Sequence, residues 1–233
     1  MIRALVLLLL ASAPAAAAER KLFVSTFDQL RVSGPFRVVV ATGRSPGGTM
    51  AGDPRQLDGV EVRQEGNTVF VRANAGGWGE QPDAPARAPV TVTLTTPSLS
   101  AAYLIGSGAV SVTGMKARRI DLSVAGTGAI AVAGADATEL NATTIGTGRV
   151  TLAGKTIKAR LLVNGAGGVD AGKLEADELN VRLDGPGEVA ARARYTATVI
   201  NTGLGRIAVA GPAKCSVKAN AGGPVTCGAG QAR

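Results

Sequence analysis

A Gly-x-Gly triplet recurs about every 20 residues through the second half of this chain of 233 residues. Successive triplets begin 20, 20, 19, 20 and 18 residues apart, and a degenerate copy, Ala-Gly-Gly at 221–223, begins 18 residues after the last of them. A fixed period of this length is typical of repeat proteins, in which each unit packs mainly against its two neighbours. The glycines of the six triplets are Gly106 and Gly108, Gly126 and Gly128, Gly146 and Gly148, Gly165 and Gly167, Gly185 and Gly187, and Gly203 and Gly205.

Apolar residues stand at constant positions around these triplets. Four and six residues after the first glycine the chain carries Val, Ile, Leu, Ala or, in the last copy, Cys, and the same classes stand four and six residues before most of them. The intervening positions are mostly Ser, Thr, Asp, Asn, Arg and Ala. Alternation with a period of two on both sides of a glycine corner predicts two short strands per repeat, each with one buried face.

A unit of 20 residues with two such strands cannot bury its apolar face alone, so each strand must pair with its counterpart in the next repeat. We therefore expect an all-β fold, a right-handed single-stranded parallel β-helix (a solenoid) of about seven coils. The glycines suit its corners, where φ is positive or backbones approach closely, and stretches such as 114–119 and 134–139 suit a third short side. An antiparallel meander or β-sandwich is the alternative, but identical residue classes at fixed offsets favour stacking.

The segment 19–100 is less regular and is predicted to form an N-terminal β cap and the first coil or coils. Its Glu-Gly-Asn-Thr stretch at 65–68 is a hairpin signal, and its Gly- and Pro-rich stretch 75–89 predicts an exposed loop. A cap of this kind would cover an open sheet edge that otherwise invites aggregation. The repeats at 101–233 are expected to continue it as one domain, and the cap's strands are expected within 22–43, 59–74 and 88–99.

Residues 1–18 have the layout of a secretory signal peptide, with Arg3 followed by an apolar run and then small residues. The run is too short to span a bilayer, and no later segment is long and apolar enough to be a transmembrane segment. We therefore expect an exported protein, located in the periplasm or at the cell surface.

The chain is basic, with a formal net charge of +8. Its Lys and Arg residues are scattered, without runs and without interleaved aromatics, so no specific nucleic-acid partner is predicted. Tyr103 and Tyr195 stand apart in the sequence, which argues against an aromatic ladder for a polysaccharide. Trp78, the single tryptophan, lies in the segment 75–89, where it either contacts a sugar or protein partner or folds over the cap.

Two cysteines, Cys215 and Cys227, lie near the C-terminus. A pair of cysteines in an exported protein is by default a disulfide, and nothing like the redox motif Cys-x-x-Cys is present. Both stand at inward-facing offsets on either side of the last corner. We expect a disulfide that fastens the open end of the stack.

The residue types limit the possible chemistry. The sequence contains no histidine, which excludes His-dependent triads and most zinc sites. Glycoside hydrolysis needs two carboxylates about 5–10 Å apart, yet aligning the repeats places no two carboxylates in one column of adjacent coils, and Asp136 and Glu139 are interpreted as a solvated edge. Asp170 follows a glycine-rich stretch, but Thr and Ala replace it in neighbouring repeats, so calcium is not favoured. No catalytic residue, cofactor or metal site is predicted.

Three stretches together resemble a known bacterial family. Residues 27–40 carry a Phe-x-x-Leu-x-Val-x-Gly-x-Phe-x-Val pattern, the Gly-small-Gly ladder follows, and 205–223 form a closing coil with a Gly-Pro element before one last corner. In this order they resemble the putative auto-transporter adhesin, head GIN domain family. The resemblance implies a parallel β-helix outside the cytoplasm and brings no catalytic residues. The chain departs from the pattern at Gly-Pro-Gly and Gly-Leu-Gly, and at 207–211, where aromatics are common in the family.

Three functions are compatible with these residues. The first is a non-enzymatic adhesin or binding surface of the envelope, in which an outward hydroxyl-rich column such as Ser111, Ala131 and Thr151 contacts a glycan or an envelope protein. The second is a structural or stress-related periplasmic protein without a ligand. The third is an enzyme that acts on acidic polysaccharide.

Overall fold

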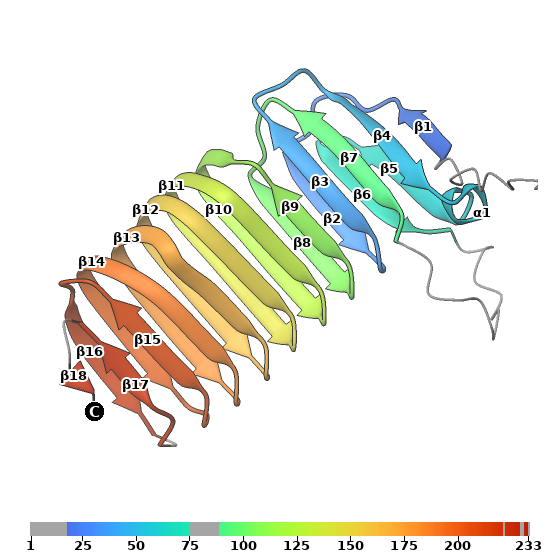
Figure 1. Ribbon diagram of the computed structural model, residues 1–233. Coiled ribbons are helices and arrows are strands. Elements are labelled where there is room, and N and C mark those ends of the chain that lie inside the picture. The colour runs from blue at the N-terminus through green and yellow to red at the C-terminus, as the bar shows by residue number, and fades with distance from the viewer. Residues whose placement is uncertain (1–17, 75–88, 221, 229–230, 233) are drawn as a thin grey trace, which may run out of the picture.

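The structure is a computed structural model and describes residues 18–74, 89–220, 222–228 and 231–232. Over these residues the strands join into one sheet that coils into a parallel β-solenoid of about six turns, with one short helix (Figure 1). Residues 1–17 of the predicted signal peptide lie outside the described residues, as does the stretch 75–88 of the predicted loop with Trp78.

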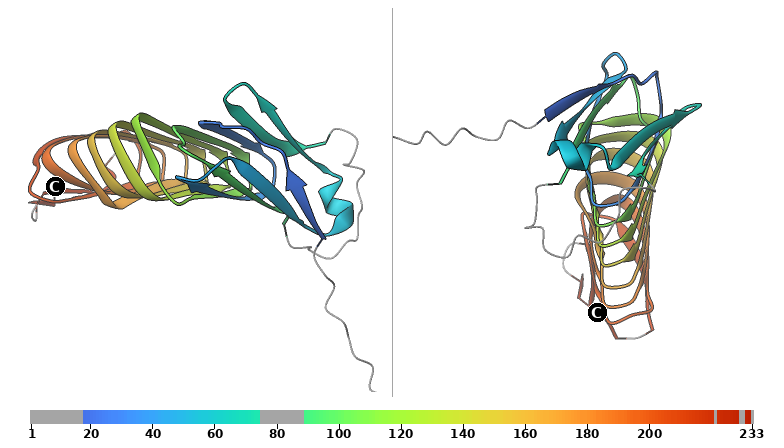
Figure 2. Two further views of the ribbon diagram at one scale, coloured as in Figure 1. Left: turned by 90° about the horizontal axis from the view of Figure 1, so that it is seen from above. Right: turned by 90° about the vertical axis from the view of Figure 1, so that its right-hand side faces the viewer.

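Five long strands build the regular part of the solenoid (Figures 1 and 2). Neighbouring strands are parallel and in register, so that Ile120 pairs with Leu140 and Leu140 with Ala159. This parallel pairing excludes the antiparallel meander and the sandwich. The strands are β10 (Met115–Gly126), β11 (Ala129–Gly146), β12 (Arg149–Asn164), β13 (Gly168–Asp184) and β14 (Glu188–Asn201).

Each coil has two broad faces and a narrow third side. Face A contains β8 (Ala101–Gly106) and the parts of β10–β14 that precede the next corner, whereas face B contains β9 (Ala109–Val112) and the parts of β11–β14 that follow a corner. The third side is formed where residues 115–117, 135–137, 154–156 and 174–176 pair in register. The long strands therefore bend continuously around this side.

The C-terminal end explains why the structure has about six turns rather than the predicted seven. Beyond the six regular triplets the degenerate corner leads only to a strand of three residues, and the chain then reverses into an antiparallel strand. The last coil is therefore incomplete. Its strands are β15 (Arg206–Ala210), β16 (Lys214–Ala219), β17 (Val225–Cys227) and β18 (Gln231–Ala232).

The N-terminal region does not stack in sequence order. Strand β2 (Gln29–Ser33) lies between β6 (Thr68–Ala73) and β8, and β3 (Arg37–Thr42) lies between β7 (Thr91–Thr96) and β9, all in parallel. The first coil in sequence is thus the second in space. Segments that are not part of the parallel stack cover the outer end of this stack.

That cover is antiparallel. Strand β5 (Val60–Glu65) forms a hairpin with β6 through the turn at Gly66 and Asn67, as the sequence predicted. On the other face β4 (Gly47–Gly52) pairs antiparallel with both β7 and β1 (Ala18–Leu22), and the short helix α1 (Pro54–Leu57) connects β4 to β5. Asp53 caps the start of this helix, and its side chain accepts a hydrogen bond from the Arg55 amide at 2.9 Å.

The predicted inward positions form the core, except Cys215 and Val217 of β16 in the last coil, which are exposed. The residues four and six positions after each first glycine, from Val110 to Cys227, are all buried. Alternating burial over so many coils excludes water from a long column of Val, Ile, Leu and Ala side chains, and this burial is the main source of stability.

The corner glycines meet two requirements, a positive φ angle and a close approach to the backbone of the preceding coil. Gly126 and Gly146 have φ angles of 117° and 103°, and a Cβ atom on either would lie 2.7–2.8 Å from a carbonyl oxygen of the preceding corner. The second glycine of a triplet is also enclosed, since a Cβ on Gly128 would lie 2.5 Å from the Gly108 carbonyl oxygen. Only glycine fits such corners without displacing the neighbouring coil.

Candidate functional site

Two columns of outward side chains alternate in charge from coil to coil beside the third side. In the parallel register each member pairs directly with the next. Lys155 Nζ lies 3.9 Å from Asp136 Oδ2, and Lys158 Nζ lies 3.6 Å from Glu178 Oε2. The first column is Lys116, Asp136, Lys155, Glu175 and Arg192, and the second is Arg119, Glu139, Lys158 and Glu178.

These columns favour one register of the coils. Each exposed ion pair alone contributes little to stability, but like charges placed opposite one another on neighbouring strands are destabilising. Neither column was predicted from the sequence, although the signal was present. The second column stands seven residues before the first glycine of four successive triplets, and most of the first column stands ten residues before it.

A hollow with a volume of about 640 Å³ lies over the third side. Strands β10–β14 all contribute to it, and Arg194 Nη1 approaches Asp177 Oδ1 to 3.9 Å across its wall. Ile157, which is 47% exposed, adds one apolar patch. We call this hollow the third-side groove, and its charged lining includes Lys116, Arg118, Asp136, Lys155, Glu175 and Arg194.

A second hollow of about 340 Å³ lies around the bend between the third side and face A. Consecutive residues of the same strands line the two hollows, so they lie side by side. We call the second one the face A groove. Its lining consists mainly of amide, hydroxyl and charged groups, among them Arg119, Asn141, Lys158, Arg160, Asn180 and Thr198.

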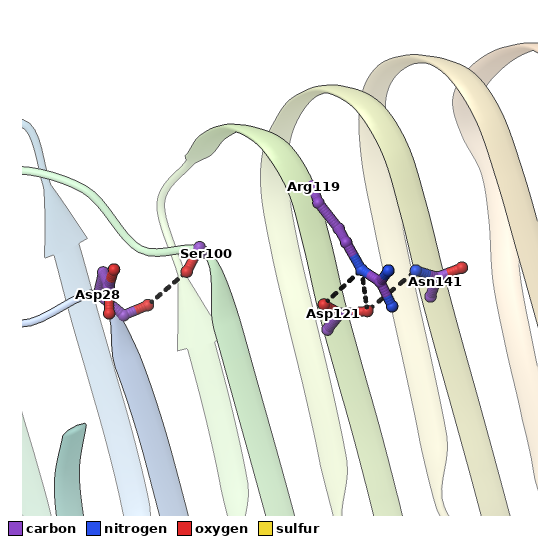
Figure 3. A network of polar contacts seen from close by, with 5 residues as sticks. All are labelled: Asp28, Ser100, Arg119, Asp121 and Asn141. Atoms are coloured by element: carbon purple, nitrogen blue, oxygen red, sulfur yellow. Dashed lines mark hydrogen bonds and ion pairs between the residues drawn. The ribbon is translucent and has the colours of Figure 1, made fainter. Parts of the chain in front are cut away.

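Two residues that line the face A groove, Arg119 and Asn141, belong to a polar network, which Figure 3 shows. Arg119 Nε donates to both carboxylate oxygens of Asp121 at 2.9 and 3.1 Å, and Asn141 Nδ2 donates to Asp121 Oδ1 at 2.9 Å. The hydrogen bond to Asp121 raises the pKa of Arg119 above its ordinary value. Arg119 and Asp121 therefore neutralise each other. Nearer the N-terminus, Ser100 Oγ donates to the backbone carbonyl of Asp28 at 3.0 Å.

Arg160 contrasts with the other two cations of this groove. Arg119 is engaged by Asp121 and Lys158 by Glu178, whereas no ion pair or hydrogen bond involves the Arg160 side chain in the described part of the chain. In the register Arg160 stands between Asn141 and Asn180, which are neutral. The arginine therefore presents an unneutralised charge at the groove.

Tyr103 is not isolated, contrary to what its place in the sequence indicated. Pairing across β6, β2 and β8 aligns Phe70, Arg31 and Tyr103 on face A. The Arg31 guanidinium lies 5.0 Å from the centre of the Tyr103 ring, within the range of a cation–π contact. Arg194 stands in the same relation to Tyr195, also at 5.0 Å. The non-sequential insertion of β2 produces the first of these contacts.

The hydroxyl column predicted from the sequence does form on face B. Ser111, Ala131 and Thr151 pair in register and are exposed, with Asp170 as the next member. Neither groove lies over this column. Only two of these four positions carry a hydroxyl group, so this column offers a ligand fewer hydrogen-bonding groups than the grooves do.

The disulfide predicted from the cysteine pair is present between Cys215 and Cys227, whose Cα atoms lie 6.1 Å apart. Cys227 is buried, but Cys215 is exposed, as are all six residues of β16. The prediction that Cys215 points into the interior is therefore wrong as far as burial is concerned: the residue is exposed, because no further coil covers this end of the stack.

The described residues contain no group of three or more His, Cys, Asp or Glu side chains placed to hold a metal ion. Asp170 Oδ1 instead accepts a hydrogen bond from the Gly172 amide at 3.2 Å, which is an ordinary local turn contact. Among the helices that the structure describes, none has the length and apolar character needed to cross a membrane.

Several solved structures share this architecture. A putative adhesin from Bacteroides fragilis superposes with a TM-score of 0.77 at 19% identity, covering 92% of this chain and 95% of that one. A putative lipid binding protein from Parabacteroides distasonis gives 0.72 at 16%, covering 91% and 96%. A putative adhesin from Parabacteroides merdae gives 0.71 at 16%, covering 91% and 95%. At such identities the likeness establishes the fold.

No curated protein matches the sequence. The profile of one protein family, described as putative auto-transporter adhesin, head GIN domain, matches residues 26–213. The match includes the N-terminal pattern, β2 to β9, and all six regular corners. The chain belongs to the putative auto-transporter adhesin, head GIN domain family.

Proposed function

We propose that the protein is an exported, non-enzymatic binding protein of the bacterial cell envelope that holds an extended polar ligand in its two grooves. The observation that carries this proposal is the parallel register, which aligns polar side chains from successive coils into adjoining hollows of about 640 and 340 Å³. No single coil gathers enough groups for a compact ligand. A polymer that contacts several coils at once uses this surface best.

The charge pattern supports binding rather than catalysis. Asp136 pairs in register with Lys116 and Lys155, and Glu139 with Arg119 and Lys158. A general acid for glycoside hydrolysis needs surroundings that keep it protonated near neutral pH, such as an apolar pocket. Carboxylates flanked by cations in both neighbouring coils lack such surroundings.

Three observations support export and an envelope role. The Cys215–Cys227 disulfide fits an oxidising compartment, and residues 1–18 have the pattern of a secretory signal. The family description and two of the structural neighbours refer to adhesins, and another neighbour is described as lipid binding. An outward-facing binding surface is consistent with each of these descriptions.

The test is retention of envelope glycans and proteins by the purified full chain, compared among surface variants. We expect Asn180→Ala combined with Thr198→Ala, both exposed in the face A groove, to reduce retention about tenfold. The matched control is Ser111→Ala with Thr151→Ala on face B, which should leave retention unchanged.

Three outcomes would contradict the proposal. Loss of retention in the face B variant alone would place the ligand on the hydroxyl column. Failure to retain any envelope component would favour a structural or stress-related protein without a ligand. Time-dependent release of reducing or unsaturated sugar ends would identify an enzyme.

A further inference from the structure

We propose that the ligand of the face A groove is an acidic polysaccharide, whose uronate carboxylates are bound by Arg160 and Arg182. This inference rests on the proposed function and specifies the ligand's chemistry. It starts from two exposed arginines of adjacent coils on face A, of which Arg160 lines the groove and Arg182 stands two residues beyond Asn180 of its lining. Neither side chain makes an ion pair or a hydrogen bond within the described residues.

The two arginines are close enough to act on one ligand. Arg160 pairs in register with Asn180, and Leu162 pairs with Arg182, so Arg182 lies one coil further and two residues along the strand. Side chains in this diagonal relation have Cα atoms about 7–8 Å apart. The guanidinium group is planar and donates two parallel hydrogen bonds to a carboxylate. One arginine on each coil therefore suits acidic groups carried by neighbouring sugars.

Neutral hydrogen-bonding groups surround Arg160. Asn141 and Asn180 are its partners in the two adjacent coils, and Thr198 follows Asn180 in the same column. Asn141 donates through Nδ2 to Asp121, which leaves its carbonyl oxygen free to accept from a sugar hydroxyl. This combination of arginine, amide and hydroxyl groups matches the carboxylate and hydroxyl groups of a uronate chain.

The repeat distance of the protein also suits a polysaccharide. Paired strands lie about 4.8 Å apart, close to the length of one hexose in an extended chain. A polysaccharide that runs along the solenoid axis therefore presents one sugar to each coil. Cations lie beside the acidic residues in and around the groove: Glu178 pairs with Lys158 and Asp121 with Arg119. Glu139 stands in register between Arg119 and Lys158.

The experiment compares binding of polygalacturonate with binding of the same polymer after full methyl esterification, which removes its charge and keeps its backbone. We expect the full chain to bind the acid form and to lose at least tenfold in affinity for the ester. Arg160→Gln should weaken binding of polygalacturonate about tenfold, and Arg160→Gln with Arg182→Gln should weaken it further.

The matched control is Arg149→Gln. Arg149 is also exposed, lies on the same strand β12 and makes no ion pair among the described residues, but it belongs to face B. The Arg149→Gln substitution removes the same charge from the same coil as Arg160→Gln, so we expect it to change the affinity for polygalacturonate less than twofold. Melting temperatures of all variants should agree with that of the parent, because these side chains are exposed.

Several results would overturn the inference. Equal losses for Arg160→Gln and Arg149→Gln would indicate unspecific attraction to a basic protein. Equal binding of polygalacturonate and its ester would indicate a neutral glycan and would leave the proposed binding function intact. Stronger Arg160-dependent binding to dextran sulfate, or to vesicles of anionic phospholipid, would identify another anion. Failure to bind these probes or any envelope glycan or protein would remove both proposals.

Discussion

The N-terminal region, β1–β9, uses side-chain contacts for some of its turns, whereas the corners of the regular coils, β10–β14, rest mainly on backbone contacts with the preceding corner. In the N-terminal region Gln64 Oε1 accepts from the Ser25 amide at 2.8 Å, and its Nε2 donates to the Thr26 carbonyl at 3.2 Å. In the regular coils the preceding corner takes this role, since the Gly148 amide donates to the Gly126 carbonyl at 2.8 Å. A side chain thus holds the chain that enters β2, and backbone holds this regular corner.

This difference follows from repetition. Where each coil repeats the last, the backbone groups of one corner meet those of the next at the correct spacing, and glycine permits the approach. The corner between β2 and β3 follows the same rule, because the Gly34 amide donates to the Ile105 carbonyl at 3.0 Å. The chain at 25–26, which leads into β2, is held instead by the Gln64 side chain, which satisfies its exposed backbone groups.

Replacing a glycine should have the largest and most unequal effect in the two regions. Gly146→Ala places a Cβ 2.8 Å from the Gly126 carbonyl oxygen at a φ of 103°, so we expect a loss of about 4 kcal/mol in the free energy of unfolding. Gly66→Ala in the β5–β6 hairpin has open space around it and a φ of 57°, so its loss should be about 1 kcal/mol.

Urea unfolding of the two variants measures this difference. Gly128→Ala separates its causes, because this position has a close backbone contact without a positive φ. A loss at Gly128 as small as that at Gly66 would mean that neighbouring coils shift easily, and that the stacked corners are not what fixes the coil spacing.

The disulfide should have the next largest effect, and a local one. Replacing both Cys215 and Cys227 by Ala should destabilise the C-terminal coil by about 3 kcal/mol in the chain-entropy account. Because coils interact mainly with their neighbours, amide exchange should accelerate in β15–β17 and stay unchanged in β10–β12. Acceleration throughout the chain would show that the solenoid unfolds as a single unit.

Two buried threonines provide the finest comparison. Thr96 Oγ1 in the N-terminal region donates to the Phe27 carbonyl, whereas Thr144 Oγ1 in the regular coils has no hydrogen-bond partner among the described residues, and both residues are 0% exposed. Thr96→Val should cost about 2 kcal/mol, because it leaves a buried carbonyl without its donor. Thr144→Val should stabilise the protein by about 1 kcal/mol.

Thermal or urea unfolding of both variants checks this pair. Equal destabilisation would mean that a water molecule satisfies the Thr144 hydroxyl and that the two regions treat buried polar groups alike. A gain in stability confined to Thr144→Val would confirm that backbone stacking, not side-chain hydrogen bonding, sustains the regular coils.

Much of the fold could be predicted from spacing alone. The offsets of apolar residues around each triplet identified the buried positions from Val110 to Val225, and the hairpin at Gly66 followed from its turn residues. The exposure of Cys215 could not be predicted in this way, because burial depends on a following coil and not on the strand's own pattern. The opposed charges in the two columns could have been found, since they recur at fixed offsets.

The sequence by itself determined that this chain stacks in parallel, because alternation and glycine recur at a nearly constant period and only stacking uses both. The tertiary structure decided the order of the first strands, which places β2 between β6 and β8 and brings Arg31 over Tyr103. It also decided which charges remain unneutralised, and so distinguished Arg160 from Arg119. Both depend on which segments lie side by side, and two stretches with the same apolar alternation fit the same position in a sheet equally well.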